Sequence, residues 1–246
     1  MLKRLASPEP APPWGFAAAI GAVVAAFLAV VIGTGIAQAI LGDADAPETI
    51  TTGWAIGAVI TIVFVLVSRQ RRSPEDAAAL RTGPLTGNQN LLFVMLFSLG
   101  FVILFDLISW VIVGDQTLAA SELLNYSRDQ IDTFGWIIAL LFMGLLQPIA
   151  EELVFRGMLF PALRTNIGIW SGFLMCAAFH AAFHLLAYPP PGDDNTVVIW
   201  YGLLLPLLDG LFFTGVRAHT GSTRAAIAAH ATFGIFAVLK VFAFTG

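Results

Sequence analysis

Long apolar segments separated by short polar ones dominate this chain. A helix needs roughly 20 mostly apolar residues to cross the hydrocarbon core of a bilayer. Seven segments are long enough for this or nearly so: 14–41, 52–67, 90–113, 133–163, 169–188, 197–216 and 223–244. The second is short, and the fourth is long enough to project beyond the bilayer. The pattern therefore predicts an all-α bundle of about seven transmembrane helices.

The polar stretch between the second and third of these segments carries its own helix signals. Ser73 is suited to cap a helix, and Pro74 suits its first position. Gly83-Pro84 would end it. The sequence has no internal repeat, so no repeat architecture is expected.

Composition supports the bilayer as the surroundings of this chain. It is 58% hydrophobic and 11% charged, whereas a soluble domain carries about 25% charged residues. The net charge of -4 and the lack of a basic block give no reason to expect a nucleic-acid partner. The single cysteine, Cys176, excludes an intramolecular disulfide framework and a cysteine-rich metal site. The first apolar segment is too long for the core of a signal peptide.

The charges between the segments test this layout, because cytoplasmic loops collect lysine and arginine. With a cytoplasmic N-terminus, nine basic residues fall inside: Lys3, Arg4, Arg69, Arg71, Arg72, Arg81, Arg164, Arg217 and Arg224. Only Arg128 falls outside. The outer loops are acidic and hold Asp43, Asp45, Glu48, Asp115, Glu122, Asp129, Asp132, Asp193 and Asp194. We therefore predict seven spans with the N-terminus in the cytoplasm and the C-terminus outside.

Ionisable residues lie within the predicted helices, where each costs a few kcal/mol or more. They are Glu151, Glu152 and Arg156 on the fourth helix, His180 and His184 on the fifth, His230 on the seventh, and Asp106 and Asp209 on the third and sixth. A single residue of this kind is as often a buried polar group, hydrogen-bonded by a neighbouring helix, as it is part of a functional site. Two glutamates and three histidines in the C-terminal half favour a functional site.

Helical spacing separates these residues by role. Glu152 and Arg156 are four residues apart, so their side chains are neighbours on one face and we expect them to pair. Glu151 points about 100° away and is left free to act as a general base. His180 and His184 also share one face, which suits a shared metal or a shared water. Pro148 predicts a kink one turn before the glutamates, with or without a functional role.

The residues from Gln147 to Gly157 resemble the first motif, EExxxR, of the CAAX protease and bacteriocin-processing family. The second family motif, FxxxH, falls on His184 when the two are aligned without gaps. The third is a histidine after a Thr-Gly-Ser turn, which matches residues 220–222 and His230. The resemblance covers about residues 133–244.

This resemblance implies a membrane helix bundle that cleaves peptide bonds within or at the bilayer. Glu151 would activate a water assisted by His184, His230 would polarise the scissile carbonyl, and Glu152 and Arg156 would orient the helix. Residues 1–132 would form N-terminal transmembrane helices and a cytoplasmic loop, and residues 133–246 the catalytic core. The expected partners are the lipid bilayer and a peptide or membrane-protein substrate, and the expected location is a bacterial inner membrane. The substrate's identity, prenylation and the oligomeric state stay open.

Two departures from the family pattern bear on mechanism. His180 stands at the phenylalanine position of the second motif, so either His180 or His184 is the motif histidine, and the ungapped alignment favours His184. No cofactor is required, but a divalent metal such as zinc is an alternative, with His180, His184 and His230 as candidate ligands and Glu151 as base. Gly234 replaces an asparagine thought to hold the oxyanion, a role left to a backbone amide, Asn195 or a histidine.

Two other functions follow if this interpretation fails. Gly234 favours a catalytically inactive relative that acts as a membrane scaffold or bacteriocin-immunity-type protein. A transporter could use the buried charges as a proton relay, but the sequence has neither the inverted repeats nor the matched broken helices that would mark one. For the protease, we expect Glu151, His184 and His230 to face one polar cavity open toward the cytoplasmic side, with Glu152 and Arg156 paired at its edge.

Overall fold

The structure is a computed structural model, and it describes residues 5–85, 90–115 and 119–245. Within these ranges the chain is helical without strands, and seven spans are long and apolar enough to cross a membrane. They are Phe16–Leu41, Pro47–Arg69, Leu91–Val113, Thr133–Ile167, Ile169–Ala187, Asn195–Thr220 and Thr223–Phe244. The predicted fold class is confirmed, with span ends within five residues of those expected. Lys3 and Arg4 lie outside the described residues.

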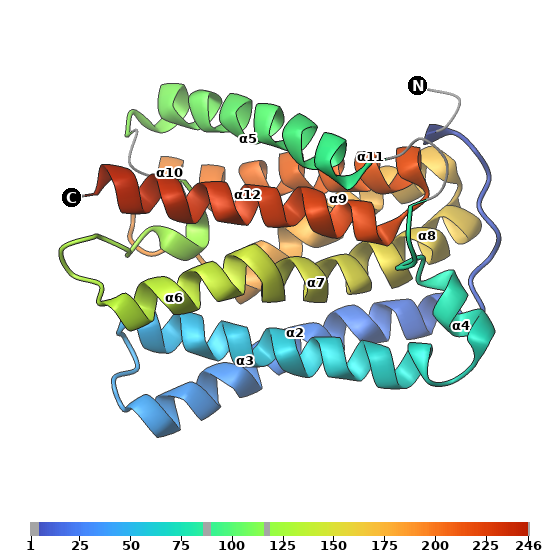
Figure 1. The fold of residues 1–246 in the computed structure, drawn as a ribbon, viewed down its shortest axis with the longest axis horizontal. Coiled ribbons are helices and arrows are strands. Elements are labelled where there is room, and N and C mark those ends of the chain that lie inside the picture. Colours follow the sequence, from blue (N-terminus) through green and yellow to red (C-terminus); the bar gives the residue numbers. More distant parts are fainter. Residues whose placement is uncertain (1–4, 86–89, 116–118, 246) are drawn as a thin grey trace.

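The first two spans form a closely packed hairpin on one side of the bundle (Figure 1). They are α2 (Phe16–Leu41) and α3 (Pro47–Val65), which continues as a π-helical turn at Leu66–Gln70. Pro47 begins α3, which makes this span longer than the sequence suggested. Glycines let the two backbones touch, since a Cβ added at Gly33 would lie 2.3 Å from the carbonyl oxygen of Gly53.

A short helix and a peripheral span follow. The side chain of Ser73 accepts a hydrogen bond from the backbone of Asp76 and caps α4 (Pro74–Ala79), as predicted. The third span, α5 (Leu91–Val113), lies on the side of the bundle opposite the α2–α3 hairpin (Figure 1). Many of its large apolar side chains are exposed, among them Leu92, Phe93 and Val111, as contact with lipid requires.

The fourth span runs through the middle of the molecule and is interrupted by π-helical turns. It consists of α6 (Thr133–Leu141), a π-helical segment at Phe142–Leu146, α7 (Gln147–Glu152), a second π-helical segment at Leu153–Leu159, and α8 (Phe160–Ile167). Pro148 lies just after the first π-helical segment, where a residue without an N–H is accommodated by a changed hydrogen-bond register. Such segments often lie at functional sites.

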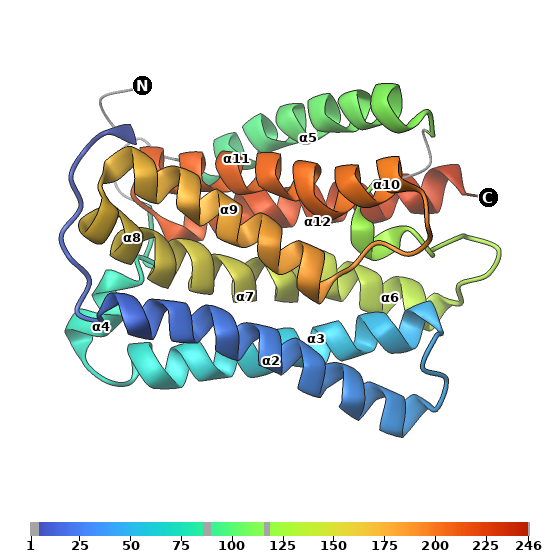
Figure 2. The same ribbon diagram turned by 180° about the vertical axis from the view of Figure 1, so that it is seen from behind.

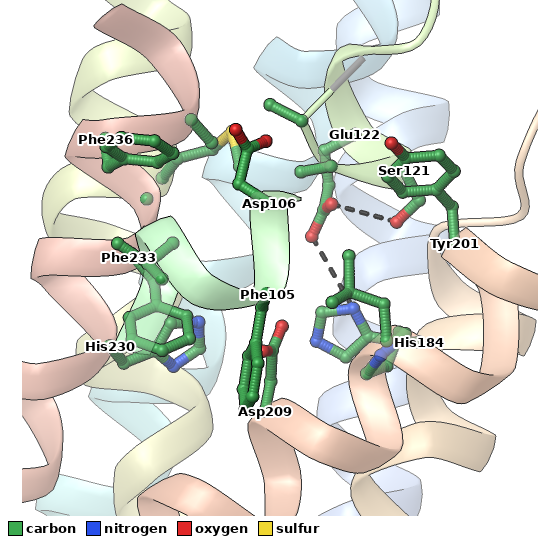
Figure 3. A pocket seen from close by; sticks show the side chains of 18 of the residues that line it. Phe105, Asp106, Ser121, Glu122, His184, Tyr201, Asp209, His230, Phe233 and Phe236 are labelled. Atoms are coloured by element: carbon green, nitrogen blue, oxygen red, sulfur yellow. Dashed lines mark hydrogen bonds and ion pairs between the residues drawn. The ribbon is translucent and has the colours of Figure 1, made fainter. Parts of the chain in front are cut away.

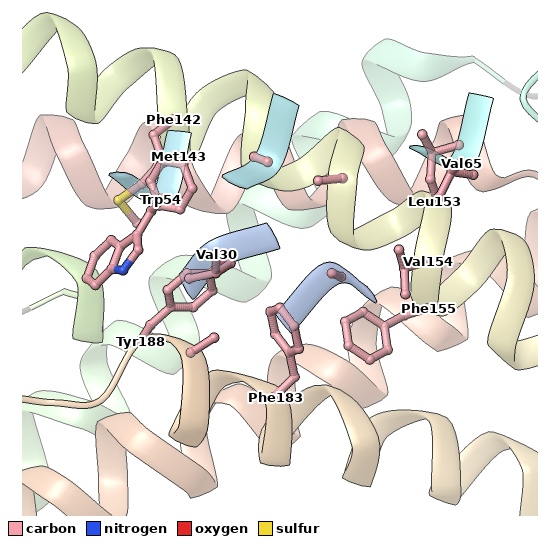
Figure 4. Close-up of a cluster of buried hydrophobic side chains, with 14 of the residues drawn as sticks. Val30, Trp54, Val65, Phe142, Met143, Leu153, Val154, Phe155, Phe183 and Tyr188 are labelled. Atoms are coloured by element: carbon pink, nitrogen blue, oxygen red, sulfur yellow. The ribbon is translucent and has the colours of Figure 1, made fainter. Parts of the chain in front are cut away.

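Three further spans pack beside the fourth (Figure 2). They are α9 (Ile169–Ala187), α11 (Leu205–Thr220) with α10 (Asn195–Ile199) and a π-helical segment at Trp200–Leu204 before it, and α12 (Thr223–Phe244). A buried aromatic cluster joins the hairpin to this core, with Trp54 and Phe142 packed on Tyr188, and Phe155 on Phe183 (Figure 4). The hairpin and the C-terminal helices therefore share one hydrophobic core.

Candidate active site

Five of the predicted site residues converge where the fourth span, α9 and α12 meet. Glu151 and Glu152 end α7, and a π-helical segment begins directly after them. His180 and His184 project from one face of α9, and His230 comes from α12. All five side chains are buried. The two sequence motifs on α9 and α12 are thus brought to the glutamates by packing of helices that lie far apart in the chain.

Glu152 and Arg156 form the predicted ion pair. Nη1 of Arg156 donates to Oε1 of Glu152 at 3.0 Å, and both side chains are fully buried. Nη2 of Arg156 donates to the carbonyl of Gly210 on α11 at 2.9 Å. Nδ1 of His230 lies 3.0 Å from the same Oε1 of Glu152. Glu152 therefore fixes both the arginine and the α12 histidine, and only the first contact was expected.

Glu151 has a different set of contacts. Its Oε2 lies 3.1 Å from Nε2 of His184 and 3.5 Å from Nδ1 of His180. Its Oε1 is buried and has no hydrogen-bond partner among the described residues. Oε2 of this carboxylate is thus held by an imidazole, Oε1 makes no hydrogen bond among the described residues, and the side chains of Gln147 and Tyr188 lie beside the group.

The contacts of His180 distinguish it from His184. Nη1 of Arg156 lies 3.2 Å from Nδ1 of His180. A guanidinium can only donate hydrogen bonds, so Nδ1 of His180 must accept one and the ring proton resides on Nε2. His180 is therefore occupied by the arginine, and this favours His184 as the histidine that works with Glu151.

One group of the described residues has the spacing of a metal site, and it consists of Glu151, His180 and His184. Their ligand atoms lie within 4.8 Å of one another. His230 is not in this group, so the three-histidine arrangement considered from the sequence is not the one assembled. The guanidinium of Arg156 touches His180, and a fixed positive charge at that distance opposes a second cation in the same low-dielectric pocket.

Glu122 is a part of the site that the sequence did not reveal. It lies in a short 3-10 helix, Ser121–Leu123, and is buried. Its Oε1 accepts a hydrogen bond from Nε2 of Gln147 at 2.6 Å. The same Oε1 lies 3.6 Å from Nδ1 of His184 (Figure 3). The sequence pattern predicts Glu122 in an acidic outer loop, whereas the structure buries it beside His184. Its flanking pairs, Ala119-Ala120 and Leu123-Leu124, are the signal that could have indicated a buried segment.

A cavity of about 60 Å³ adjoins these groups (Figure 3). Its polar lining includes Glu122, Gln147, Asp209 and, as expected, His184 and His230. Glu151, Glu152 and Arg156 were also expected to face it, but they are not among its lining residues; Glu151 reaches the lining through His184, whose Nε2 lies 3.1 Å from its Oε2. Asn195 is exposed at the start of α10 and does not line it.

The position of this cavity corrects one expectation. It was expected to open toward the arginine-rich end of the bundle, yet residues 119–122 form part of its wall, and they belong to the segment joining α5 to α6 at the acidic end. The reason is that this segment folds back into the bundle and carries Glu122 to His184.

The glycine at the third motif's asparagine position has a steric cause. A Cβ added at Gly234 would lie 1.9 Å from the carbonyl oxygen of Met143 in the first π-helical segment of the fourth span. That distance is shorter than any tolerated non-bonded contact, so α12 could not hold asparagine here without moving. The close packing of α12 against this segment therefore explains why glycine stands at the position of the family's asparagine.

Together, these features define a multi-pass membrane protein with a buried glutamate–histidine centre beside a cavity. Residues 133–236 match the family model described as Rce1-like, Type II CAAX prenyl endopeptidase Rce1-like. The chain therefore carries an Rce1-like type II CAAX prenyl endopeptidase domain, and the resemblance is confirmed over these residues. No match was found among curated proteins or solved structures. The division into parts at residue 133 stays a prediction, as do the individual roles of the site residues.

Proposed function

We propose that this protein is an intramembrane endopeptidase in which Glu151 activates a water for attack on a peptide carbonyl. The observation that carries the proposal is the carboxylate of Glu151, with Oε2 on His184 and a buried Oε1 that has no hydrogen-bond partner among the described residues. Oε1 would take a proton from the water as its oxygen bonds to the carbonyl carbon. The proton then passes to the amine nitrogen as the C–N bond breaks, which completes hydrolysis.

His184 lies between two carboxylates, and this supports its role in orienting and stabilising the centre. Glu151 faces its Nε2 and Glu122 faces its Nδ1. A carboxylate beside the far nitrogen of a histidine helps to fix the orientation of the ring. Glu122 is thus a positioning residue that acts on Glu151 through His184.

Two groups could stabilise negative charge on the carbonyl oxygen. His230 lines the cavity, and Glu152 holds it through Nδ1, leaving Nε2 as the atom to face the substrate. The amide of Gln147 lies in the same lining one helical turn before Glu151 and can supply the donor that Gly234 lacks. Donors held in place before charge develops contribute most to such stabilisation.

We further propose that the reaction is of the metal-independent glutamate type. The guanidinium of Arg156 lies against His180, which is one of the three residues that would have to ligate a cation. In addition, a metal held by Glu151 would engage the carboxylate that the mechanism needs as base. Glu151, His184 and His230 therefore carry the chemistry, and Glu152, Arg156 and His180 hold them in place.

The experiment is a cleavage screen of peptides and membrane-protein segments with the purified protein in bilayer discs, read by mass spectrometry with and without a chelator. We expect internal cleavage at the same rate in both conditions. Loss of cleavage with chelator and its recovery with zinc would assign a metalloprotease instead. No cleavage of any segment would favour the inactive scaffold.

A further inference from the structure

The two ends of the bundle differ sharply in charge. The end where the fourth and sixth spans finish holds seven arginines of the described residues: Arg69, Arg71, Arg72, Arg81, Arg164, Arg217 and Arg224. Among the described residues, the opposite end carries one basic residue, Arg128, and nine acidic ones, of which Glu122 is buried in the site: Asp43, Asp45, Glu48, Asp115, Glu122, Asp129, Asp132, Asp193 and Asp194. Because basic residues stay on the cytoplasmic side, the acidic end faces away from the cytoplasm.

The cavity extends from the catalytic centre toward the acidic end. Its wall includes residues 119–122 and Ser109, which lies near the end of α5. It also includes Tyr201, near the start of the sixth span. Its deeper wall holds Phe213 and His230. Residues 119–122, Ser109 and Tyr201 thus belong to the half of the bundle next to the acidic loops.

The N-terminal segment packs against the arginine-rich end, where it lines a separate pocket with Glu75, Arg81 and Pro161. Glu9 is buried there and forms ion pairs with Arg81 at 3.0 Å, Arg164 at 3.7 Å and Arg217. Nη2 of Arg164 also donates to the backbone carbonyls of residues 5 and 7, at 3.0 Å and 2.7 Å. Nε1 of Trp14 also donates a hydrogen bond to the backbone carbonyl of Met158 at 3.1 Å.

A fully buried apolar layer separates these ion pairs and hydrogen bonds from the catalytic centre. After Glu152, the fourth span continues through Phe155, Met158, Leu159 and Phe160, each 0% exposed, before it reaches Arg164. Among the described residues, the catalytic centre therefore has a solid packed wall on its arginine-rich side and a cavity on its acidic side.

We propose that the site receives its substrate from the non-cytoplasmic side of the membrane. The substrate class is an exported or membrane-anchored polypeptide whose scissile bond lies at the outer interface, with apolar residues beside it. The apolar part of the cavity wall supports this last point, with Phe105, Phe213, Phe233 and Phe236. The inference deepens the proposed peptidase function and depends on it for the chemistry, but not for the direction of access.

Direction of access is tested by labelling single introduced cysteines with a membrane-impermeant maleimide. Ala120→Cys places a thiol in the cavity wall, and Ala119→Cys is a second variant of the same wall. Arg72→Cys places one at the arginine-rich end, where the arginine side chain is 69% exposed. The native Cys176 is fully buried, so the unmodified protein is the background control. We expect Ala120→Cys to react in right-side-out vesicles and Arg72→Cys only in inverted ones.

The opposite pattern, or labelling of the cavity cysteines from neither side, would overturn the proposal. Labelling of both positions from the same side would overturn it as well, because the two ends would then not face opposite compartments. None of these results depends on catalysis, so they leave the peptidase assignment untouched.

The substrate class is tested by mapping new protein N-termini in cells that carry the wild type or Glu151→Gln. We expect Glu151-dependent termini to lie in exported or outward-facing segments. Termini confined to cytoplasmic segments would contradict the substrate class while retaining the peptidase. If no Glu151-dependent termini formed, both the substrate class and the peptidase assignment would be contradicted, while the labelling result would still report the direction of access.

Discussion

At the residue scale, each histidine proposed to act in catalysis has a carboxylate on its Nδ1. Glu122 lies 3.6 Å from this atom of His184, and Glu152 lies 3.0 Å from this atom of His230. Both rings are therefore oriented so that Nε2 can make a second contact. For His184, this second contact is with Glu151. Of the two glutamates of the first motif, Glu152 thus contacts Arg156 and His230, whereas Glu151 contacts His184. Substitutions at the two positions should therefore have different effects.

Glu152→Gln should lower stability, because Arg156 would stay buried without its counter-charge. Breaking a buried pair from one side costs about 3–5 kcal/mol. The double change Glu152→Gln with Arg156→Leu should recover part of this loss. Thermal unfolding in detergent measures both. If Glu152→Gln were as stable as the wild type but inactive, Glu152 and not Glu151 would be the base.

Glu122→Gln should slow cleavage while the protein stays folded. Glutamine keeps the shape and an acceptor for Gln147, but the negative charge beside Nδ1 of His184 is lost. Loss of a carboxylate that orients a histidine typically costs about 10–100-fold in activity. We expect the loss in kcat with KM little changed, and a shift in the pH profile of kcat. Asp129→Asn, an exposed acid of the same segment, is the matched control, and equal rates for the two variants would remove Glu122 from the mechanism.

At the scale of elements, the approach of α12 to the first π-helical segment decides what can stand at position 234. Gly234→Ala should destabilise the protein by about 1–3 kcal/mol, the usual cost of overpacking, because the new Cβ meets the carbonyl of Met143. Gly100→Ala on α5 is the control, since no atom lies within 4 Å of the added group. Unfolding in detergent compares the two. A stable Gly234→Ala protein would mean that this helix contact is not tight.

The elements also show how far the sequence could be read. Hydropathy predicted seven spans because a bilayer demands long apolar runs, and helical spacing predicted the Glu152–Arg156 pair because both residues lie on one helix. The contact between Glu122 and His184 joins residues 62 positions apart through a short irregular segment, where no periodicity reports burial. The tight packing at Gly234 depends likewise on which helix faces it, and sequence spacing does not contain that information.

At the scale of the whole molecule, the charged ends set the orientation in the membrane. Reporter fusions after Glu48 and Asp193 should report the outside, and a fusion after Arg72 should report the cytoplasm. The reason is the concentration of arginines at one end of the bundle. An Arg72 fusion that reported the outside would contradict the seven-span orientation.

Glu151 is the base that we propose activates water. Glu151→Gln keeps the side-chain shape and removes the charge, so it should fold and unfold like the wild type. Loss of one general base typically slows a reaction by about 10²- to 10⁴-fold, and we expect cleavage to fall by this amount. The measurement is the cleavage rate of an accepted peptide by the two proteins in the same bilayer preparation, with their thermal stabilities recorded in parallel. A stable Glu151→Gln protein that cleaves at the wild-type rate would contradict the account.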